Sequence, residues 1–377
     1  MTALLALVGC SSGDRTEVAR PGQRPQTEGP EAKPIDGGEP TSLHPASGLL
    51  LGVPVYPGDF ADPFVLPVGS RFYAYATNTV DAHVPVLVAE SRPEARYLGD
   101  ALPNLPAWST PGLVWAPAVF AGPNGYVLYY TTKSVAFGRQ CISRAVAADP
   151  AGPFVDLSSG PMVCQRTLGG SIDPSVVVDR HGTPWLLFKN DGNCCGLQTS
   201  LWIQQLTADG QNLLGAPQKL LQPSEKWEGD LIEAPSMVVT PHEYLLFYSG
   251  NAWDSSKYAV GYATCKEITG PCTRPADADT PWMASSRFAS GPGGQEFFGA
   301  VGQIWMIYHG WKPGEAGTKG SPRRLYLDIV TVSGGIPRRV GARRAWTLLI
   351  LLIAVFAACA GALVWWIHRR RRRRARQ

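Results

Sequence analysis

Apolar and polar residues alternate over short stretches of the chain, and these stretches come in pairs separated by a turn. Residues 171–190, SIDPSVVVDRHGTPWLLFKN, show the pattern: an Asp-Pro pair, a β-branched run, a polar turn and a second apolar run. Such a pair is typical of a β-hairpin. Amphipathic helical periodicity is almost absent, so the pattern predicts an all-β fold.

The hairpin pattern recurs five times at nearly equal spacing. Its prolines are residues 63, 117, 174 and 235, which gives spacings of 54, 57 and 61, and Gln295 takes the proline's place after a further 60 residues. A ring of small antiparallel sheets packed face to face buries both faces of every hairpin. The repeat therefore predicts a five-bladed β-propeller. A β-sandwich is the alternative, although it does not predict equal spacing.

Three acids share one register of this repeat. Asp62 and Asp173 directly precede their prolines, and Glu233 lies one position earlier in the fourth unit, where the second unit has Trp115. The first strand of a propeller blade lines the central channel, so these side chains are expected to meet in one axial pocket. A single Asp-Pro is more often a turn-former that accepts backbone hydrogen bonds. Three like charges in one pocket favour a catalytic interpretation, because they are costly to ionise together.

Carboxylates beside aromatic rings are the groups used in glycoside hydrolysis, where one acid protonates the leaving oxygen and another activates water or attacks. The third acid is expected to orient the proton donor and tune its pKa. A metal site is the competing use of three acids. Pocket aromatics and the lack of a nearby cluster of His and acidic residues make it the second choice, so no metal ligand is assigned.

The motifs between Gly52 and Val332 resemble those of glycoside hydrolase family 43, the five-bladed propeller enzymes that include α-L-arabinofuranosidases, β-xylosidases and arabinanases. In order they are GDFADPFVL, VWAPAVF, SIDPSVVVD, WEGDLIEAPSMV, YLLFYSGN, GPGGQ, MIYHGW and RRLYLDIV. The resemblance implies that Asp62 is the general base, Glu233 the general acid and Asp173 the acid that tunes and orients Glu233. It also implies inversion in a single displacement, with carboxyl groups roughly 6.5 to 9.5 Å apart.

The resemblance further implies three substrate-binding residues. Trp115 resembles a wall of the sugar subsite, and Arg324 the arginine that reaches substrate, with Arg323 as the alternative register. Many members have a His after the GPG motif, tied to a central calcium or to the pocket floor, where this chain has Gln295. No cofactor is therefore expected to be required, and calcium in the propeller channel is a possible addition.

The sequence thus predicts an inverting glycosidase that cleaves arabinofuranosyl or xylosyl linkages in extracellular arabinan, arabinoxylan or envelope arabinan. A non-catalytic propeller that binds glycans at the cell surface is one alternative, although a binding module need not keep all three acids. A propeller glycosidase acting on fructosyl bonds is another. Its typical Asn-Asp-Pro-Asn motif differs from the triplet Ala61, Asp62 and Pro63 found here.

The formal charge of +4 arises at the C-terminus, where eleven arginines follow residue 337 and no acid occurs, so the remainder carries −7. A mildly acidic body argues against nucleic acid as a partner. Residues 346–367 carry no charge and have Trp at both ends, which predicts a transmembrane helix. The basic tail, 368–377, is then expected in the cytoplasm. A nucleic-acid patch or localisation signal is the disfavoured alternative, because the arginines abut the span.

The N-terminal 50 residues predict a second attachment. Residues 1–10 resemble a truncated signal segment with a lipobox whose lipidated residue would be Cys10. Residues 11–50 are rich in Gly, Pro, Glu and Ser and are expected to be a disordered tether. The catalytic domain is predicted over 51–332, followed by a linker over 333–345. These segments predict a single-pass membrane protein with an extracellular catalytic domain and membrane lipid as a partner.

Six cysteines lie in the predicted extracellular part, an even number that favours disulfides. The preferred pairing joins Cys265 to Cys272, and the next joins Cys141 to Cys164. Zinc is the alternative for Cys194 and Cys195, but adjacent thiolates without a second pair of ligands make a poor zinc site.

Overall fold

The computed structural model describes residues 53–90 and 95–340. Their strands form five antiparallel sheets, which we number as blades in chain order. Blade 1 contains β1 (Phe64–Val68), β2 (Arg71–Tyr75), β3 (Pro85–Ala89) and β4 (Arg96–Asp100). Blade 2 contains β5 (Ser109–Gly122), β6 (Gly125–Ser134) and β7 (Gln140–Ala147). Blade 3 contains β8 (Ser171–Val178), β9 (Pro184–Asn190), β10 (Leu201–Leu206) and β11 (Leu213–Leu221). Blade 4 contains β12 (Ile232–Val239), β13 (Tyr244–Gly250), β14 (Ala259–Cys265) and β15 (Cys272–Thr273). Blade 5 contains β16 (Ser290–Ala300), β17 (Gln303–Trp311), β18 (Arg324–Ser333) and β19 (Ile336–Arg339).

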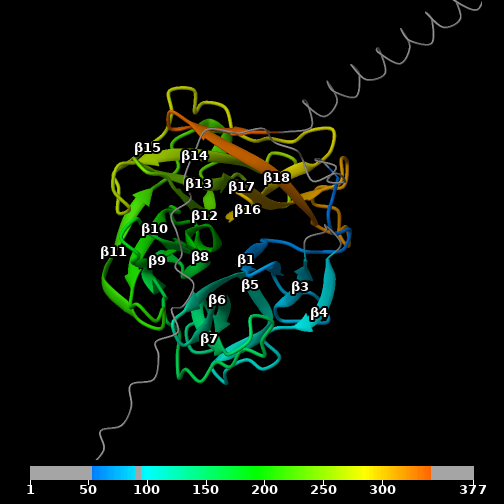
Figure 1. Ribbon diagram of the computed structural model, residues 1–377, viewed down its shortest axis with the longest axis vertical. Coiled ribbons are helices and arrows are strands. Elements are labelled where there is room, and N and C mark those ends of the chain that lie inside the picture. Colours follow the sequence, from blue (N-terminus) through cyan, green and yellow to red (C-terminus); the bar gives the residue numbers. More distant parts are fainter. Residues whose placement is uncertain (1–52, 91–94, 341–377) are drawn as a thin grey trace, which may run out of the picture. The chain divides into compact units, whose positions relative to one another are not determined.

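The five sheets are arranged around a common centre (Figure 1), with β1, β5, β8, β12 and β16 innermost. These strands contact one another in that order, and β16 contacts β1. The fold is a five-bladed β-propeller, as the repeat predicts. The sandwich alternative is wrong, because two stacked sheets do not give a closed ring of five innermost strands.

Each blade is apolar on both faces because it packs between two others. In β13 all seven residues are buried. Leu246 belongs to the core shared with blade 3, whereas its neighbour Phe247 belongs to the core shared with blade 5. Side chains alternate across a strand, so a buried central strand appears as a continuous apolar run rather than as strict alternation.

Both ends of the described chain contribute to blade 5. The Val55 amide donates to the Leu325 carbonyl (2.8 Å), and the Phe60 amide donates to the Arg323 carbonyl (2.9 Å), which links the segment before β1 to β18. Beyond the predicted domain end at Val332, β19 adds a fourth strand, and the Trp282 indole donates to the Pro337 carbonyl (3.0 Å). The first residues of the predicted linker therefore belong to the propeller.

Three short 3-10 turns complete the described structure: η1 (Arg166–Leu168), η2 (Gly192–Cys195) and η3 (Lys226–Glu228). Within 53–90 and 95–340, no helix is long and apolar enough to cross a membrane. The predicted transmembrane span (346–367), lipobox segment (1–10), tether (11–50) and basic tail (368–377) lie outside the described residues and remain predictions.

All six cysteines in the propeller form disulfides. Cys141 is joined to Cys164 and Cys265 to Cys272, which confirms both predicted pairings. The third bond joins the adjacent residues Cys194 and Cys195. The zinc alternative for this pair is wrong, because both sulfur atoms are committed to the disulfide.

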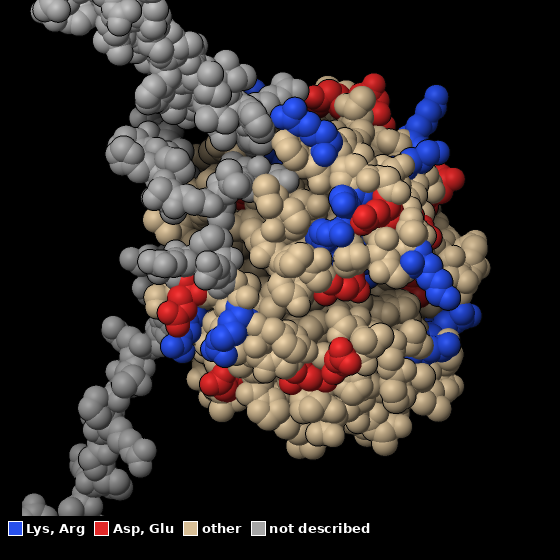
Figure 2. All heavy atoms as spheres, turned by 90° about the vertical axis from the view of Figure 1, so that its right-hand side faces the viewer, with Lys and Arg blue, Asp and Glu red and all other residues tan. Residues whose placement is uncertain are grey.

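Acidic and basic side chains are intermixed on the face shown in Figure 2 rather than gathered by sign. The absence of a nucleic-acid partner remains a prediction from the charge count.

Candidate active site

Each innermost strand, or its entry, passes through one residue with a positive φ, at or next to the proline of the repeat. We call these the inner-turn residues. They are Asp62 (49°), Ala116 (43°), Asp173 (54°), Ala234 (49°) and Gly294 (57°). Residues other than glycine rarely adopt this conformation, and each costs on the order of 1–3 kcal/mol. Its recurrence in all five blades shows that the closed ring maintains it.

The backbone amide of every inner-turn residue donates a hydrogen bond to a side chain of the preceding blade. The acceptors are His309 Nδ1 for Asp62 (3.0 Å), Thr77 Oγ1 for Ala116 (3.0 Å), Thr131 Oγ1 for Asp173 (3.2 Å), Asp173 Oδ2 for Ala234 (2.9 Å) and Ser249 Oγ for Gly294 (3.0 Å). These bonds satisfy donors that the bulged strands leave without a ladder partner.

Four of the five acceptors occupy the same position, opposite the residue that precedes the inner turn. They are Thr77, Thr131, Ser249 and His309. In blade 3 the equivalent residue is Lys189, opposite Ile172. An ammonium group has no acceptor, so the Asp173 carboxylate accepts the Ala234 amide in its place. The junction between blades 3 and 4 therefore differs from the other four, because its acceptor is not the residue opposite the one that precedes the inner turn.

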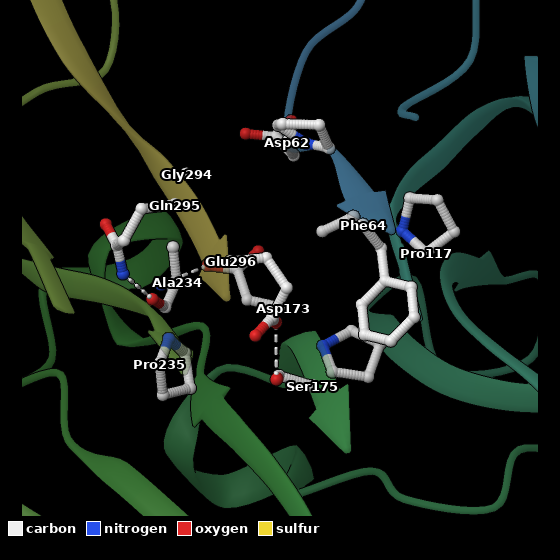
Figure 3. A pocket seen from close by; sticks show the side chains of 13 residues that line it. Asp62, Phe64, Pro117, Asp173, Ser175, Ala234, Pro235, Gly294, Gln295 and Glu296 are labelled. Atoms are coloured by element: carbon white, nitrogen blue, oxygen red, sulfur yellow. Dashed lines mark hydrogen bonds between the residues drawn. The ribbon is translucent and has the colours of Figure 1, made fainter. Parts of the chain in front are cut away.

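The inner-turn residues and the prolines that follow them line one axial pocket (Figure 3). Asp62 and Asp173 both line it, from blades 1 and 3. Glu233 precedes the inner turn of blade 4 and is only 8% exposed. The ring thus brings together acids from three blades that are 60 or more residues apart in the chain, as the repeat predicts.

Asp62 is held as an ionised carboxylate. The Thr77 hydroxyl donates to its Oδ2 (2.6 Å), and Arg323 Nη1 lies 3.4 Å from the same oxygen. Burial alone would raise the pKa of Asp62, but the Arg323 charge and the Thr77 hydrogen bond bring it below its usual value. This carboxylate is 21% exposed, so it is both charged and accessible to water.

His309 completes the surroundings of Asp62 as a neutral ring. Burial lowers the pKa of His309 to about 3. Its Nδ1 accepts the Asp62 amide, which leaves the ring proton on Nε2. The imidazole stacks on the Tyr258 ring, with centroids 5.9 Å apart. Gly294 lies against it, since a Cβ there would fall 2.6 Å from His309 Nδ1 and 3.0 Å from Asp62 Oδ1.

Glu233 is held by two donors, one to each oxygen. Lys189 Nζ donates to Oε2 (2.9 Å), and the Tyr258 hydroxyl donates to Oε1 (2.9 Å). Lys189 is fully buried and also donates to Asn193 Oδ1 (2.7 Å). Burial would lower the pKa of Lys189, but the charges of Glu233 and Asp173 raise it above its usual value, so the ammonium stays charged.

Asp173 has the opposite electrostatic character to Asp62. Burial and the neighbouring Glu233 charge raise the pKa of Asp173 to about 8, against the effect of Lys189. Asp173 therefore keeps its proton to a much higher pH than an isolated Asp side chain. A site with one ionised acid and one acid that retains its proton has the division that general base and general acid catalysis requires.

Comparison with known proteins agrees with this chemistry. The family model described as Glycosyl hydrolases family 43 matches residues 51–337. The chain belongs to glycosyl hydrolase family 43. It is therefore a glycosidase, which sets aside the non-catalytic and fructosyl-family alternatives.

Two curated relatives resemble this chain over more than half of its length. The β-D-galactofuranosidase xynD of Aspergillus niger is 26% identical over 254 residues, 61% of this chain and 70% of that protein. The extracellular exo-α-(1→5)-L-arabinofuranosidase ArbA of Cellvibrio japonicus is 25% identical over 235 residues, 56% of this chain and 66% of that protein. A crystal structure of a thermostable family-43 glycoside hydrolase superposes with a TM-score of 0.66 and 25% identity, covering 80% of this chain and 96% of that one.

The two candidate arginines of this family 43 chain have different partners. Arg323 contacts Asp62 and lies over the Trp253 ring, 4.7 Å from its centroid. Arg324 Nη1 instead pairs with Glu315 Oε2 (2.9 Å). Adjacent residues of an extended strand point to opposite sides, which explains why only one reaches the acids. The structure thus brings Arg323, the alternative register, to the acids rather than Arg324, and substrate contact by either arginine remains a prediction.

Trp115 and Gln295 lie at their predicted positions, with different surroundings. Trp115 is half-buried at the bulge of β5, in the place that Glu233 takes in β12. Gln295 is 2% exposed, and its amide group is bonded within the protein. Its Nε2 donates to the Ala234 carbonyl (2.9 Å), and its Oε1 accepts from the Ser249 hydroxyl (2.9 Å). Gln295 thus links blades 4 and 5, and its substrate contact remains a prediction.

The channel floor carries a further carboxyl group. Glu296 accepts the Ser175 hydroxyl on Oε2 (2.6 Å), and burial raises its pKa to about 7. Among the residues the structure describes, no group of three or more His, Cys, Asp or Glu side chains is placed to hold a metal ion. The oxygen atoms of Gln295 and Glu296 already accept protein hydrogen bonds, so they are a poor fit to calcium. Calcium in the channel remains a prediction without a role in the chemistry below.

The residues that tune the acids were not predicted from the sequence. Lys189, Tyr258 and Thr77 contact Glu233 or Asp62 directly, and the exposed Trp253 supports Arg323. A signal for Lys189 was present. The second strands of the five units end in YAT, YTT, FKN, YSG and YHG, and only the third has a cation in the middle position.

Proposed function

We propose that this family 43 chain is an inverting glycosidase that cleaves arabinofuranosyl linkages, with xylosyl linkages as the second substrate class, in extracellular glycans. The observation that carries the proposal is the opposite electrostatic treatment of the acids. Asp62 is ionised and open to water, whereas burial and the Glu233 charge raise the pKa of Asp173 to about 8. Inversion needs this division, because one carboxylate takes a proton from water while the other gives one to the leaving oxygen.

In the proposed reaction Asp62 removes a proton from the attacking water, and Glu233 protonates the glycosidic oxygen as the bond to the anomeric carbon breaks. Lys189 and Tyr258 fix the Glu233 carboxyl group. Asp173 tunes Glu233 and holds the backbone of blade 4 through the Ala234 amide. Arg323 holds Asp62 and lies over the Trp253 ring.

The choice of sugar rests on the relatives. One is named a β-D-galactofuranosidase and the other an exo-α-(1→5)-L-arabinofuranosidase. Both sugars are furanoses, and they share the ring configuration, so we favour arabinofuranosides as the substrate of this chain. Three disulfides are consistent with an oxidising compartment. We keep the extracellular, membrane-attached location as part of the proposal.

The test is a hydrolysis screen of the full-length chain against arabinan, arabinoxylan, xylo-oligosaccharides and p-nitrophenyl furanosides, with product anomers followed by proton NMR from the first turnovers. We expect arabinofuranosides to be cleaved fastest, with the inverted anomer appearing first. Release of the retained anomer would contradict the mechanism. Faster cleavage of xylosides would move the substrate to the second class.

A further inference from the structure

The carboxylate of Asp191 is buried and has no hydrogen-bond partner among the described residues. It directly follows β9 and is 7% exposed. It occupies the N-cap of η2 without using its side chain as a cap. Burial raises its pKa to about 6, and the charges that act on it are those of Lys189, Glu233 and Arg139.

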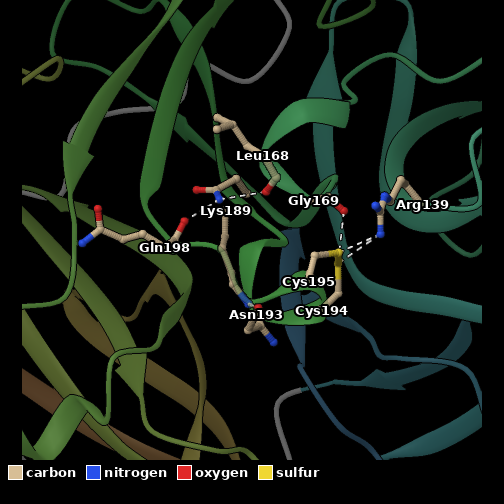
Figure 4. The surroundings of a disulfide bond; sticks show 9 residues. Arg139, Leu168, Gly169, Lys189, Asn193, Cys194, Cys195 and Gln198 are labelled. Atoms are coloured by element: carbon tan, nitrogen blue, oxygen red, sulfur yellow. Dashed lines mark hydrogen bonds between the residues drawn. A yellow bond between two sulfur atoms is a disulfide. The ribbon is translucent and has the colours of Figure 1, made fainter.

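The disulfide between Cys194 and Cys195 lies in the same 3-10 turn (Figure 4). Arg139 Nη1, from the turn between β6 and β7, lies 2.7 Å from Cys195 Sγ. Cys194 Sγ lies 3.5 Å from the Gly169 carbonyl oxygen, and Cys194 itself is exposed. The bond therefore presents a rigid, weakly polar surface to solvent where blades 2 and 3 meet.

Three partly exposed apolar side chains belong to the segments around the disulfide. Phe137 (39% exposed) lies in the turn that carries Arg139, Leu168 (36%) precedes Gly169, and Leu197 (45%) follows the disulfide and donates its amide to the Gly192 carbonyl. We call these residues the disulfide shelf: Cys194, Cys195, Phe137, Leu168 and Leu197. The shelf lies next to the catalytic acid, because Asn193 of the same turn accepts a hydrogen bond from Lys189, which holds Glu233.

We propose that the disulfide shelf and Asp191 form the binding site for the leaving-group sugar. This inference rests on the proposed function, in which Glu233 protonates the oxygen of that sugar. A sugar ring has an apolar face of C–H groups and an edge of hydroxyl groups. The shelf packs against the face, and the Asp191 carboxylate accepts hydroxyl groups from the edge. Asp191 is thus a specificity-determining residue rather than a fourth acid of the reaction.

The test compares leaving groups with and without hydroxyl groups. For Asp191→Asn, we expect kcat/KM on arabinotriose to fall about tenfold or more, since a hydrogen bond to a charged group is lost. On p-nitrophenyl arabinofuranoside, whose leaving group has no sugar hydroxyl, the loss should be several-fold smaller and limited to the effect of the Asp191 charge on Lys189. Equal losses on both substrates, with a shifted pH profile, would overturn the proposal and show that Asp191 acts through Lys189 and Glu233.

Binding is measured separately from turnover, so that failure of the proposed reaction is distinguishable from failure of this site. Calorimetric titration of the parent or an inactive Glu233→Gln chain with arabinotriose should show weaker binding when Asp191→Asn is added. Unchanged affinity would overturn the proposal, whatever the enzyme hydrolyses.

The shelf has its own pair of variants. Cys194→Ser with Cys195→Ser should raise KM for arabinotriose several-fold. Cys265→Ser with Cys272→Ser removes a disulfide from the outer edge of blade 4 and is the matched control, with KM unchanged. Equal KM values in the two double variants would contradict a role for the shelf.

Discussion

At all five junctions between neighbouring blades, a side chain accepts the backbone amide of the next inner turn. Four junctions use one kind of acceptor and the fifth uses another. At four junctions a threonine, serine or neutral histidine accepts the amide of the next inner turn. At the junction of blades 3 and 4 Asp173 accepts this amide, and Lys189 turns to Glu233. The four junctions show that the closed ring needs a side-chain acceptor for the amide of each inner turn. The exception shows where a buried charge has been introduced at an additional energetic cost.

Replacement of Lys189, the cation at the junction of blades 3 and 4, should have the largest effect on activity. Lys189→Met removes the charge and the donor that fix Glu233, and we expect kcat to fall by about 100-fold, a large share of what a positioned acid contributes. Lys189 also lowers the pKa of Asp173, so the alkaline limb of the pH profile should move to higher pH. Steady-state kinetics across pH measure both effects. Lys266→Met, at an exposed position, is the control. Equal rates in the two variants would contradict a special role for Lys189 at the junction of blades 3 and 4.

The second-largest effect on activity is expected for Asp173, the acid that accepts the inner-turn amide at this junction. Asp173→Asn keeps an oxygen for the Ala234 amide but removes the ionisable group beside Glu233. In the parent, activity should decline as pH rises through about 8, where Asp173 loses its proton. The variant cannot undergo this ionisation, so the alkaline limb of its pH profile should move by about one unit or more. An unmoved alkaline limb would show that Asp173 does not tune Glu233.

A smaller effect is expected at the junction of blades 5 and 1, where Asp62 lies. Arg323 lowers the pKa of Asp62, so Arg323→Ala should move the acid limb of the profile to higher pH and reduce kcat/KM by up to about tenfold. Arg324→Ala, which breaks only the pair with Glu315, should change kcat/KM less than about twofold. A larger loss for Arg324→Ala would restore the original choice between the two arginines.

The smallest effect on activity is expected at the junction of blades 2 and 3, where a threonine accepts the inner-turn amide. Thr131→Val leaves the Asp173 amide without its acceptor, which costs on the order of 1–3 kcal/mol and should lower Tm by roughly 2–8 °C. The rate at saturating substrate should change less than in either variant of the blade 3 and 4 junction. Thermal unfolding of Thr131→Val and of the exposed control Thr331→Val tests this difference. Equal Tm values would contradict a structural role for the inner-turn bond.

The blade count and the register of the acids could be predicted from the sequence, because both follow from a local pattern repeated along the chain. Asp62, Asp173 and Trp115 are at equivalent or adjacent repeat positions, and the ring converts that register into proximity. The role of Lys189 could not be predicted from the repeat in the same way. Its function depends on what the equivalent residues of the other blades bond, and those partners lie in neighbouring blades.

Other details depend on geometry that periodicity does not encode. The choice between Arg323 and Arg324 depends on where β18 begins, and a shift of one residue reverses the side to which each points. Strand β19 was missed because its four residues, IPRR, follow a Gly-Gly turn and end in arginines that resemble a juxtamembrane linker. The bond between Cys194 and Cys195 was missed because sequence separation favours pairing across a loop.

The most direct test of the central claim, that the exceptional junction holds the proton donor, compares leaving groups in Glu233→Gln. A general acid matters most when the leaving group is a poor one. We expect Glu233→Gln to lose about 100-fold or more in kcat on arabinobiose and far less on 2,4-dinitrophenyl arabinofuranoside, with an unchanged circular dichroism spectrum. Equal losses on the two substrates, or no loss on arabinobiose, would show that Glu233 is not the acid and would contradict the account.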